Sequence, residues 1–173
     1  MKQLSRKRQA GFALFAVYLI FLVYVLFFWL RTGSGDASDA SLADYARHST
    51  NFVPFRTIEI YWYVLRRYGF VWRSWWVRNL LGNLVLFLPM GIFLPALFPS
   101  LRRWYRTILA TALIVVCMEV LQLITRTGSC DVDDLILNVL GCAIGYLIWF
   151  LFYRLIMRTE TSPLRKHSSD PSS

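Results

Sequence analysis

The chain has 173 residues, of which 57% are hydrophobic, and its formal net charge is +9. A soluble domain of this length would not need so much apolar sequence, and here the apolar residues are gathered in blocks. The three cysteines are too few and too scattered for a disulfide framework or a metal site. The basic residues flank the apolar blocks, so we expect anionic lipid, and no nucleic acid, as their partner.

The first apolar block covers residues 11–30, twenty residues without a charge. A helix of that length crosses a hydrocarbon layer of about 30 Å. A cleaved signal peptide is the alternative interpretation, because Lys2, Arg6, Lys7 and Arg8 give a basic start. However, the block exceeds the usual signal core of about 7–15 residues, and no small-x-small cleavage site follows directly. We therefore predict a first transmembrane helix.

Three further apolar blocks lie at 80–98, 107–125 and 135–153. Together with the first block they predict an all-α integral membrane protein with four transmembrane helices. The 80–98 block is the least regular, because polar and helix-breaking residues interrupt it at Asn83, Pro89, Gly91 and Pro95.

The short connections predict the orientation in the membrane. Basic residues gather at the N-terminus, between the second and third blocks, and after the fourth block, whereas the connection between the third and fourth blocks carries three aspartates and only Arg126. The positive-inside rule then places both termini in the cytoplasm and the acidic connection outside, in a multi-pass protein of the cell membrane. We expect a basic cytoplasmic N-terminus over 1–10, a membrane domain over 11–157 and a disordered cytoplasmic tail over 158–173.

The first outer loop has two parts. Residues 32–49 are rich in Ser, Ala, Asp and Gly and are interpreted as a solvated linker. Residues 58–78 predict an amphipathic helix in the membrane interface, with Ile58, Trp62, Leu65, Tyr68, Trp72 and Trp76 on one face. We expect a basic face opposite them, formed by Arg66, Arg67, Arg73 and Arg78. The alternative is an aromatic belt before the second transmembrane helix, with no ligand.

Polar residues in three of the predicted membrane helices lie near their outer ends. Burying a lone carboxylate at membrane depth costs on the order of 3 kcal/mol, so Glu119 requires a partner, a water-filled cavity or a proton. At helical spacing, Asp134 and Asn138 share one face with Gly141 and Gly145, which predicts a packing seam of small residues with a polar end. The whole set predicts one pocket open to the outside, formed by Asn79, Asn83, Glu119, Gln122, Arg126, Asp131, Asp133, Asp134 and Asn138.

Each of these residues also has a structural interpretation. One or more of the three aspartates could cap the fourth helix, which is favourable by about 0.3–1 kcal/mol. Asn138 could bond across helices, and Glu119 could pair with Arg126. Within the set we expect Asp131 and Asp133, in the outer loop, to be the residues that meet a ligand.

Four segments resemble the VanZ-like family of small bacterial membrane proteins. They are "NFVPF", "NLLGNLVLFLPMGIFL", "EVLQLITR" and "CDVDDLILNVLGCAIGY", and they occur in the family's order. The resemblance implies a multi-pass helical domain in the cell envelope. It also implies a link to antibiotic resistance, because the family's namesake is an accessory determinant of resistance to teicoplanin, a glycopeptide. The positions that match the family are Asn83, Pro89, Gly91, Glu119, Gln122, Asp131, Asp134, Asn138, Gly141 and Gly145.

Three functions are compatible with these observations. The first is a membrane factor without enzymatic activity and without a cofactor, which recognises a lipid-linked envelope precursor or a lipoglycopeptide at the outer leaflet. The second is an enzyme in which Asp131, Asp133 and Asp134 with Glu119 hold Mg²⁺ against a lipid phosphate. The third is a small transporter or assembly subunit, in which Glu119 takes up a proton and the glycine face contacts another copy of the chain.

Overall fold

The computed structural model describes residues 6–29, 41–69 and 75–161. In chain order, the helices are α1 (Arg6–Tyr24), a π-helical turn η1 (Val25–Trp29), α2 (Leu42–His48), α3 (Arg56–Tyr68), α4 (Trp75–Leu86), α5 (Leu88–Leu97), the 3₁₀ turn η2 (Pro99–Leu101), α6 (Trp104–Ile124) and α7 (Val132–Thr161). Two short strands, β1 (Thr50–Asn51) and β2 (Cys130–Asp131), pair in parallel. The protein is all-α apart from this pair.

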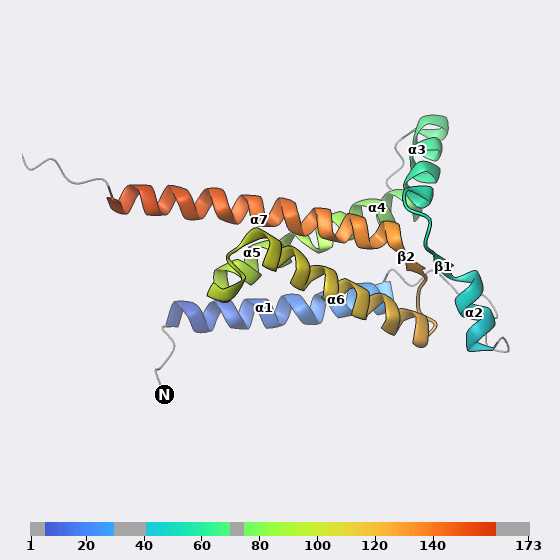
Figure 1. Ribbon diagram of the computed structural model, residues 1–173, viewed down its shortest axis with the longest axis horizontal. Helices are drawn as coiled ribbons and strands as arrows, with labels where there is room; N and C mark the ends of the chain where they lie inside the picture. The colour runs from blue at the N-terminus through green and yellow to red at the C-terminus, as the bar shows by residue number, and fades with distance from the viewer. Residues whose placement is uncertain (1–5, 30–40, 70–74, 162–173) are drawn as a thin grey trace, which may run out of the picture.

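Three helices are long and apolar enough to cross a membrane, namely Arg6–Phe28, Trp104–Ile124 and Val132–Ile156 among the residues described. They run along the long axis of the molecule (Figure 1). These helices correspond to the predicted spans 11–30, 107–125 and 135–153, but each is longer than the apolar block. Helix α1 already begins at Arg6, and α7 runs to Thr161, into the segment predicted as a disordered tail. Apolar sequence marks the hydrocarbon layer, whereas the hydrogen bonds of a helix continue into the headgroup region.

The predicted span 80–98 is divided between α4 and α5. The break lies at Phe87, and Pro89 follows in the first turn of α5, where it has no N–H to continue the hydrogen bonding of α4. The Tyr18 hydroxyl of α1 donates to the Leu86 carbonyl at the break, at 2.8 Å. Taken together across the break, the apolar helical stretch Leu81–Leu97 is shorter than the three spans above. A fourth span stays a prediction.

Helices α4 and α5 pack backbone to backbone against α7. A Cβ added at Gly141 would lie 2.0 Å from the Leu84 carbonyl oxygen, and one added at Gly145 would lie 1.9 Å from that of Leu88. A Cβ added at Gly91 of α5 would likewise lie 2.0 Å from the Cys142 carbonyl oxygen of α7. The small-residue face of α7 is therefore covered by helices of the same chain.

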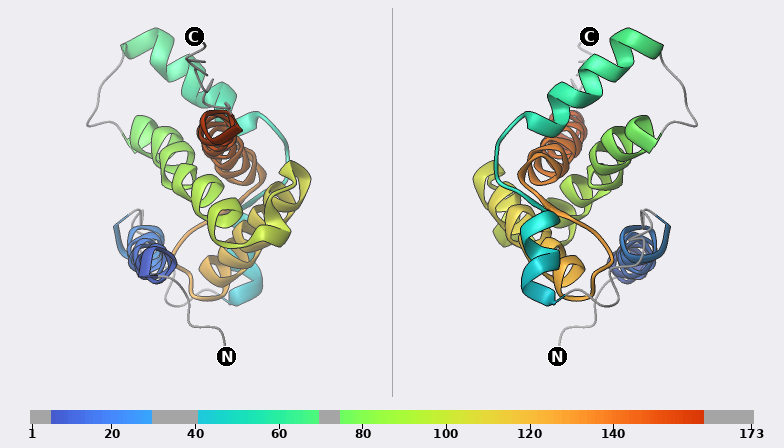
Figure 2. Two further views of the ribbon diagram at one scale, coloured as in Figure 1. Left: turned by 90° about the vertical axis from the view of Figure 1, so that its left-hand side faces the viewer. Right: turned by 90° about the vertical axis from the view of Figure 1, so that its right-hand side faces the viewer.

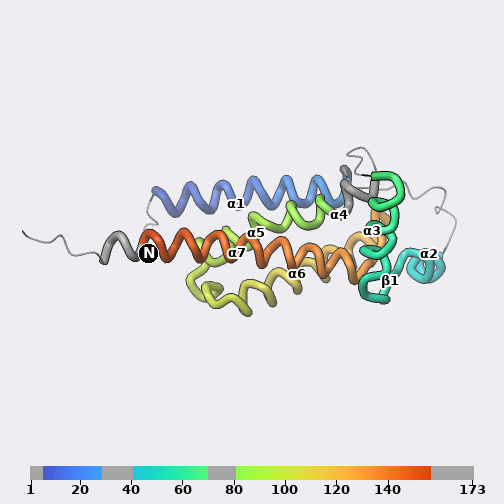
Figure 3. Tube along the Cα trace, turned by 90° about the horizontal axis from the view of Figure 1, so that it is seen from above, coloured from blue at the N-terminus to red at the C-terminus, as the bar shows by residue number. Residues whose placement is uncertain are grey.

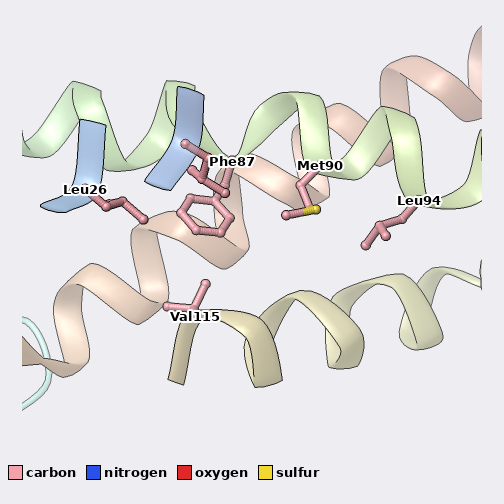
Figure 4. Packing of buried hydrophobic residues seen from close by; sticks show 6 residues of the cluster. Leu26, Phe87, Met90, Leu94 and Val115 are labelled. Atoms are coloured by element: carbon pink, nitrogen blue, oxygen red, sulfur yellow. The ribbon is translucent and has the colours of Figure 1, made fainter. Parts of the chain in front are cut away.

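The hydrophobic core lies between α1, α5 and α6. Leu26, Phe87, Met90, Leu94 and Val115 are buried and turn toward one another across these helices (Figure 4). The end views in Figure 2 show α4 and α5 among the three long helices, and α5 contacts all three. The outward faces of the long helices expose large apolar side chains, as expected for helices in lipid, including Leu14, Val17, Leu109, Leu113, Leu147 and Leu151.

One end of the bundle is covered by α2, α3 and the strand pair, and α3 lies across the bundle axis (Figures 1 and 3). We call it the acidic end, because α6 ends there and α7 begins there with Asp133 and Asp134. The predicted linker 32–49 contains α2, which Ser41 caps by accepting the Asp44 N–H at 3.1 Å. Tyr45 of α2 is buried and donates its hydroxyl to the Gly128 carbonyl at 2.8 Å. The linker interpretation is therefore wrong for residues 42–48.

The predicted helix 58–78 is shorter than expected. Helix α3 ends at Tyr68, where Gly69 takes a positive φ of 71° that favours glycine. Residues 70–74, which include Arg73, lie outside the described residues, and residues 75–78 belong to α4. The Arg66 guanidinium lies over the Trp62 ring, 4.9 Å from its centroid. The expectation that Arg66 lies opposite Trp62 is wrong, because residues four apart share a helix face.

Candidate functional site

Asp133 of α7 caps the first turn of α3. The N-cap residue of α3 is Phe55, whose side chain cannot accept a hydrogen bond. The Asp133 carboxylate takes its place and accepts the backbone N–H groups of Phe55 at 2.5 Å, Thr57 at 2.7 Å and Ile58 at 3.2 Å. A negative charge at a helix N-terminus is also favourable electrostatically. Asp133 is completely buried and holds α3 on the start of α7, in contrast to the expected contact with a ligand.

Asp131 caps α7 and joins the two strands to α3. It accepts the Asp133 N–H at 2.9 Å, which is the bond of an N-cap side chain. The other donors to its carboxylate are the Asn51 amide at 3.1 Å and the Thr57 hydroxyl at 2.6 Å. Asn51 also accepts the Val53 N–H at 3.2 Å and so shapes the loop before α3. Asp131 is buried as well, so the capping interpretation describes its contacts.

A second group of polar side chains lies behind these caps, where α4, α6 and α7 meet. The Asn83 amide donates to Asp134 at 2.5 Å, and Glu119 accepts the backbone N–H of Asp131 at 3.3 Å. Asn138, one turn beyond Asp134, is 2% exposed, and its side-chain oxygen has no hydrogen-bond partner. We call Asn83, Glu119, Asp134 and Asn138 the polar cluster.

The polar cluster offers more acceptors than donors. The carboxyl groups of Glu119 and Asp134 are close enough to interact electrostatically. The hydrogen bonds to these two groups come from the Asn83 amide and the Asp131 N–H, and neither donor is charged. An unpaired buried acceptor such as the Asn138 oxygen costs about 1–3 kcal/mol. The arrangement therefore suits a group that donates hydrogen bonds, such as an ammonium or hydroxyl groups.

Two residues of the predicted pocket lie elsewhere. Gln122 donates to the Leu26 carbonyl at 2.9 Å, which joins α6 to the π-helical end of α1. Arg126 follows the end of α6 in a left-handed conformation with φ of 54°. Arg126 makes contacts of its own, and Glu119 accepts the backbone N–H of Asp131. The side chains of Arg78 and Asn79, also predicted for the basic face and the pocket, lie outside the described residues, although α4 includes their backbone.

An apolar surface borders the site. The loop Phe52, Val53 and Phe55 exposes its large side chains, with Phe52 at 78%, and α3 adds exposed Trp62 and Tyr63. Phe55 adopts φ of 68°, which is unusual for a bulky residue and is held by the bond from its N–H to Asp133. Three arginines of α3 are exposed beside these residues, namely Arg56, Arg66 and Arg67.

The side chains at the acidic end do not gather as metal ligands. Within the described residues, no three His, Cys, Asp or Glu side chains are grouped as a metal ion requires. The carboxylates of Asp131 and Asp133, which would be Mg²⁺ ligands in the alternative enzymatic function, accept N–H and O–H groups of the protein. Burial raises the pKa of the nearby Cys130 thiol, and the neighbouring carboxyl groups, Glu119 first, raise it further.

Sequence reasoning missed Asn51 and Thr57. Asn51 begins the "NFVPF" segment, so the family resemblance was the available signal for it. Nothing local indicates Thr57, because its hydroxyl meets Asp131 across 74 residues of sequence.

The comparisons with known proteins give one match. No curated protein and no solved structure matches the chain significantly. The model of the VanZ/LLP1 family matches residues 15–153, which include the core, the polar cluster and the capping aspartates. The match covers most of the chain and agrees with the resemblance of the four segments. The protein is a membrane protein that belongs to the VanZ/LLP1 family.

Proposed function

We propose that the protein recognises a lipid-linked or lipidated envelope molecule at the outer leaflet, and that the polar cluster binds the polar group of this ligand. The observation that carries the proposal is the buried Asn138 oxygen, which has no hydrogen-bond partner and lies one helical turn from Asp134. A ligand with N–H or O–H donors would supply the missing bond. Enzymatic activity is not part of the proposal.

The proposed orientation places the acidic end outside the cell. Arg6, Lys7 and Arg8 lie at the other end, as do Arg102, Arg103, Arg106 and Arg154. Arg56, Arg66 and Arg67 lie at the acidic end, but they belong to a long loop, to which the positive-inside rule applies weakly. The short basic connections therefore support cytoplasmic termini. Helices α4 and α5 together would form the fourth span, kinked at Phe87. The polar cluster would then lie at the outer ends of three spans.

The apolar loop and α3 support a ligand with an acyl chain. Phe52, Val53 and Phe55 would lie in the membrane interface with Trp62, and the α3 arginines would contact phosphate or carboxylate groups. The capping bonds of Asp131 and Asp133 connect this surface to the polar cluster. A lipoglycopeptide of the teicoplanin type has an acyl chain together with amine and sugar donors, so it fits both parts. Resistance to such compounds is the proposed role in the cell.

Equilibrium binding of teicoplanin to the full chain in lipid nanodiscs tests the proposal. Replacing one charged or buried acceptor typically costs about 1–3 kcal/mol, so we expect Asp134→Asn and Asn138→Leu to weaken binding by about tenfold or more. Glu59→Gln is the matched control, because Glu59 is an exposed carboxylate at the same end. Removing the acyl chain from teicoplanin should also weaken binding. Equal affinity of all variants and of the control would contradict the proposal.

A further inference from the structure

A ladder of aromatic side chains runs along the second half of α7, toward the end of the bundle opposite the polar cluster. Tyr146 and Trp149 lie with ring centroids 5.5 Å apart, and Trp149 stacks on Tyr153 at 5.2 Å. Tyr146 also stacks on Phe150 at 6.3 Å. All four rings are half-buried. At helical spacing they form one continuous face of α7.

Two arginines lie on this aromatic ladder. The Arg102 guanidinium is 5.3 Å from the centroid of Tyr153, and the Arg154 guanidinium is 5.0 Å from that of Phe150. Arg102 precedes α6, and its carbonyl accepts the Tyr146 hydroxyl at 2.7 Å, which fixes this turn against α7. Both arginines are exposed, and cation–π contacts hold their planar groups on the rings.

The surroundings of this pair are positively charged. Exposed basic side chains at the same end include Arg6, Lys7, Arg8, Arg103 and Arg106. The carboxylate side chains that the structure describes lie at the acidic end or in α2 and α3 beside it, whereas the side chain of Glu160 in α7 lies outside the described ones. Neither Arg102 nor Arg154 forms an ion pair with any side chain within the described residues. An anion from outside the chain is therefore the complement of this surface.

We propose that Arg102, Arg154 and the aromatic ladder form a binding site for the phosphate headgroup of an anionic phospholipid. A guanidinium matches phosphate oxygens with two parallel hydrogen bonds, and the rings on which the two groups lie keep them in place. The aromatic residues are of the type found where a helix leaves the hydrocarbon layer. The acyl chains would continue along the exposed apolar side chains of α7, including Leu147 and Leu151. This site is independent of the polar cluster and of its ligand.

Native mass spectrometry of the full chain tests the proposal, with phosphatidylglycerol and phosphatidylcholine as the lipid probes. We expect retention of phosphatidylglycerol over phosphatidylcholine, and a loss of affinity of about tenfold in Arg102→Gln and Arg154→Gln. Arg103→Gln is the matched control, because it removes the same charge one residue away, where the side chain bonds to Tyr105 instead of facing α7. Arg102→Lys keeps the charge but not the paired bonds, so its affinity should fall between those of the wild type and Arg102→Gln.

Three outcomes would contradict the proposed lipid site. If Arg103→Gln weakens binding as much as Arg102→Gln, the attraction is a property of the whole basic end. If phosphatidylcholine binds as tightly as phosphatidylglycerol, the headgroup charge is not recognised. If millimolar inorganic phosphate displaces the lipid, the site binds free phosphate and not a lipid. Folding of each variant is checked by circular dichroism, and Arg102→Lys keeps the test decisive if Arg102→Gln does not fold.

Discussion

Removing the Asp133 carboxylate should release α3 from the bundle. Asp133→Ala deletes the acceptor of three backbone N–H groups, those of Phe55, Thr57 and Ile58. Loss of an ordinary N-cap costs about 0.5–2 kcal/mol, and a hydrogen bond to a charged group contributes about 1.5–3 kcal/mol. The Phe55 N–H lies at an exposed residue and can bond to water after the substitution. We therefore expect a local cost of about 2–3 kcal/mol.

Hydrogen exchange measured by mass spectrometry gives the assay. A cost of 2–3 kcal/mol corresponds to about 30- to 150-fold faster exchange in peptides that cover 55–65, while α6 and the middle of α7 should exchange as in the wild type. Glu59→Ala is the control, because Glu59 is an exposed acid in the first turn of the same helix. Unchanged exchange of α3 in Asp133→Ala, or an equal increase in Glu59→Ala, would refute the assignment of Asp133 as the cap of α3.

Three further predictions concern packing and the free thiol. Gly145→Ala places a methyl group 1.9 Å from a backbone carbonyl oxygen and should lower the stability by more than about 2 kcal/mol in thermal unfolding, whereas Gly11→Ala meets only a flexible side-chain end at 2.9 Å and should be tolerated. Gln122→Met loses the bond to the Leu26 carbonyl and should cost about 1 kcal/mol, seen as faster exchange at the end of α1 only. In a variant with Cys130 as the single thiol, the raised pKa leaves less thiolate at neutral pH, so maleimide labelling should be slow and should rise with pH to above 9. Half-maximal labelling at or below about pH 8.5 would contradict that shift.

The three long helices and the seam of α7 could be predicted from the sequence because their signals are local. About twenty apolar residues in succession mark a span, and the spacing of Gly141 and Gly145 marks a face that can approach a neighbour. The same spacing rule, applied to Trp62 and Arg66, predicts that the two side chains share one face of α3, as the structure shows.

The role of Asp133 could not be predicted from the sequence. Its partners lie 75–78 residues earlier in the chain, and they are backbone groups, which no residue type indicates. The three aspartates of one short segment therefore have two roles. Asp131 and Asp133 cap helices, and Asp134 belongs to the polar cluster. The end of α3 was not predicted either. The aromatic and basic pattern continues past Tyr68, and Gly69 alone marks the position at which the helix ends.

The polar cluster as an outward-facing binding site is the central claim, and cysteine accessibility tests it most directly. Asp134→Cys, at a half-buried position of the polar cluster in a chain without its native cysteines, would be labelled in intact cells by a maleimide that does not cross membranes, with and without teicoplanin. Val115→Cys, buried in the apolar core, is the control that should not react. The proposed function predicts labelling of Asp134→Cys from outside and protection by teicoplanin. Labelling that reaches it only after the membrane is opened, or that teicoplanin does not slow, would contradict it.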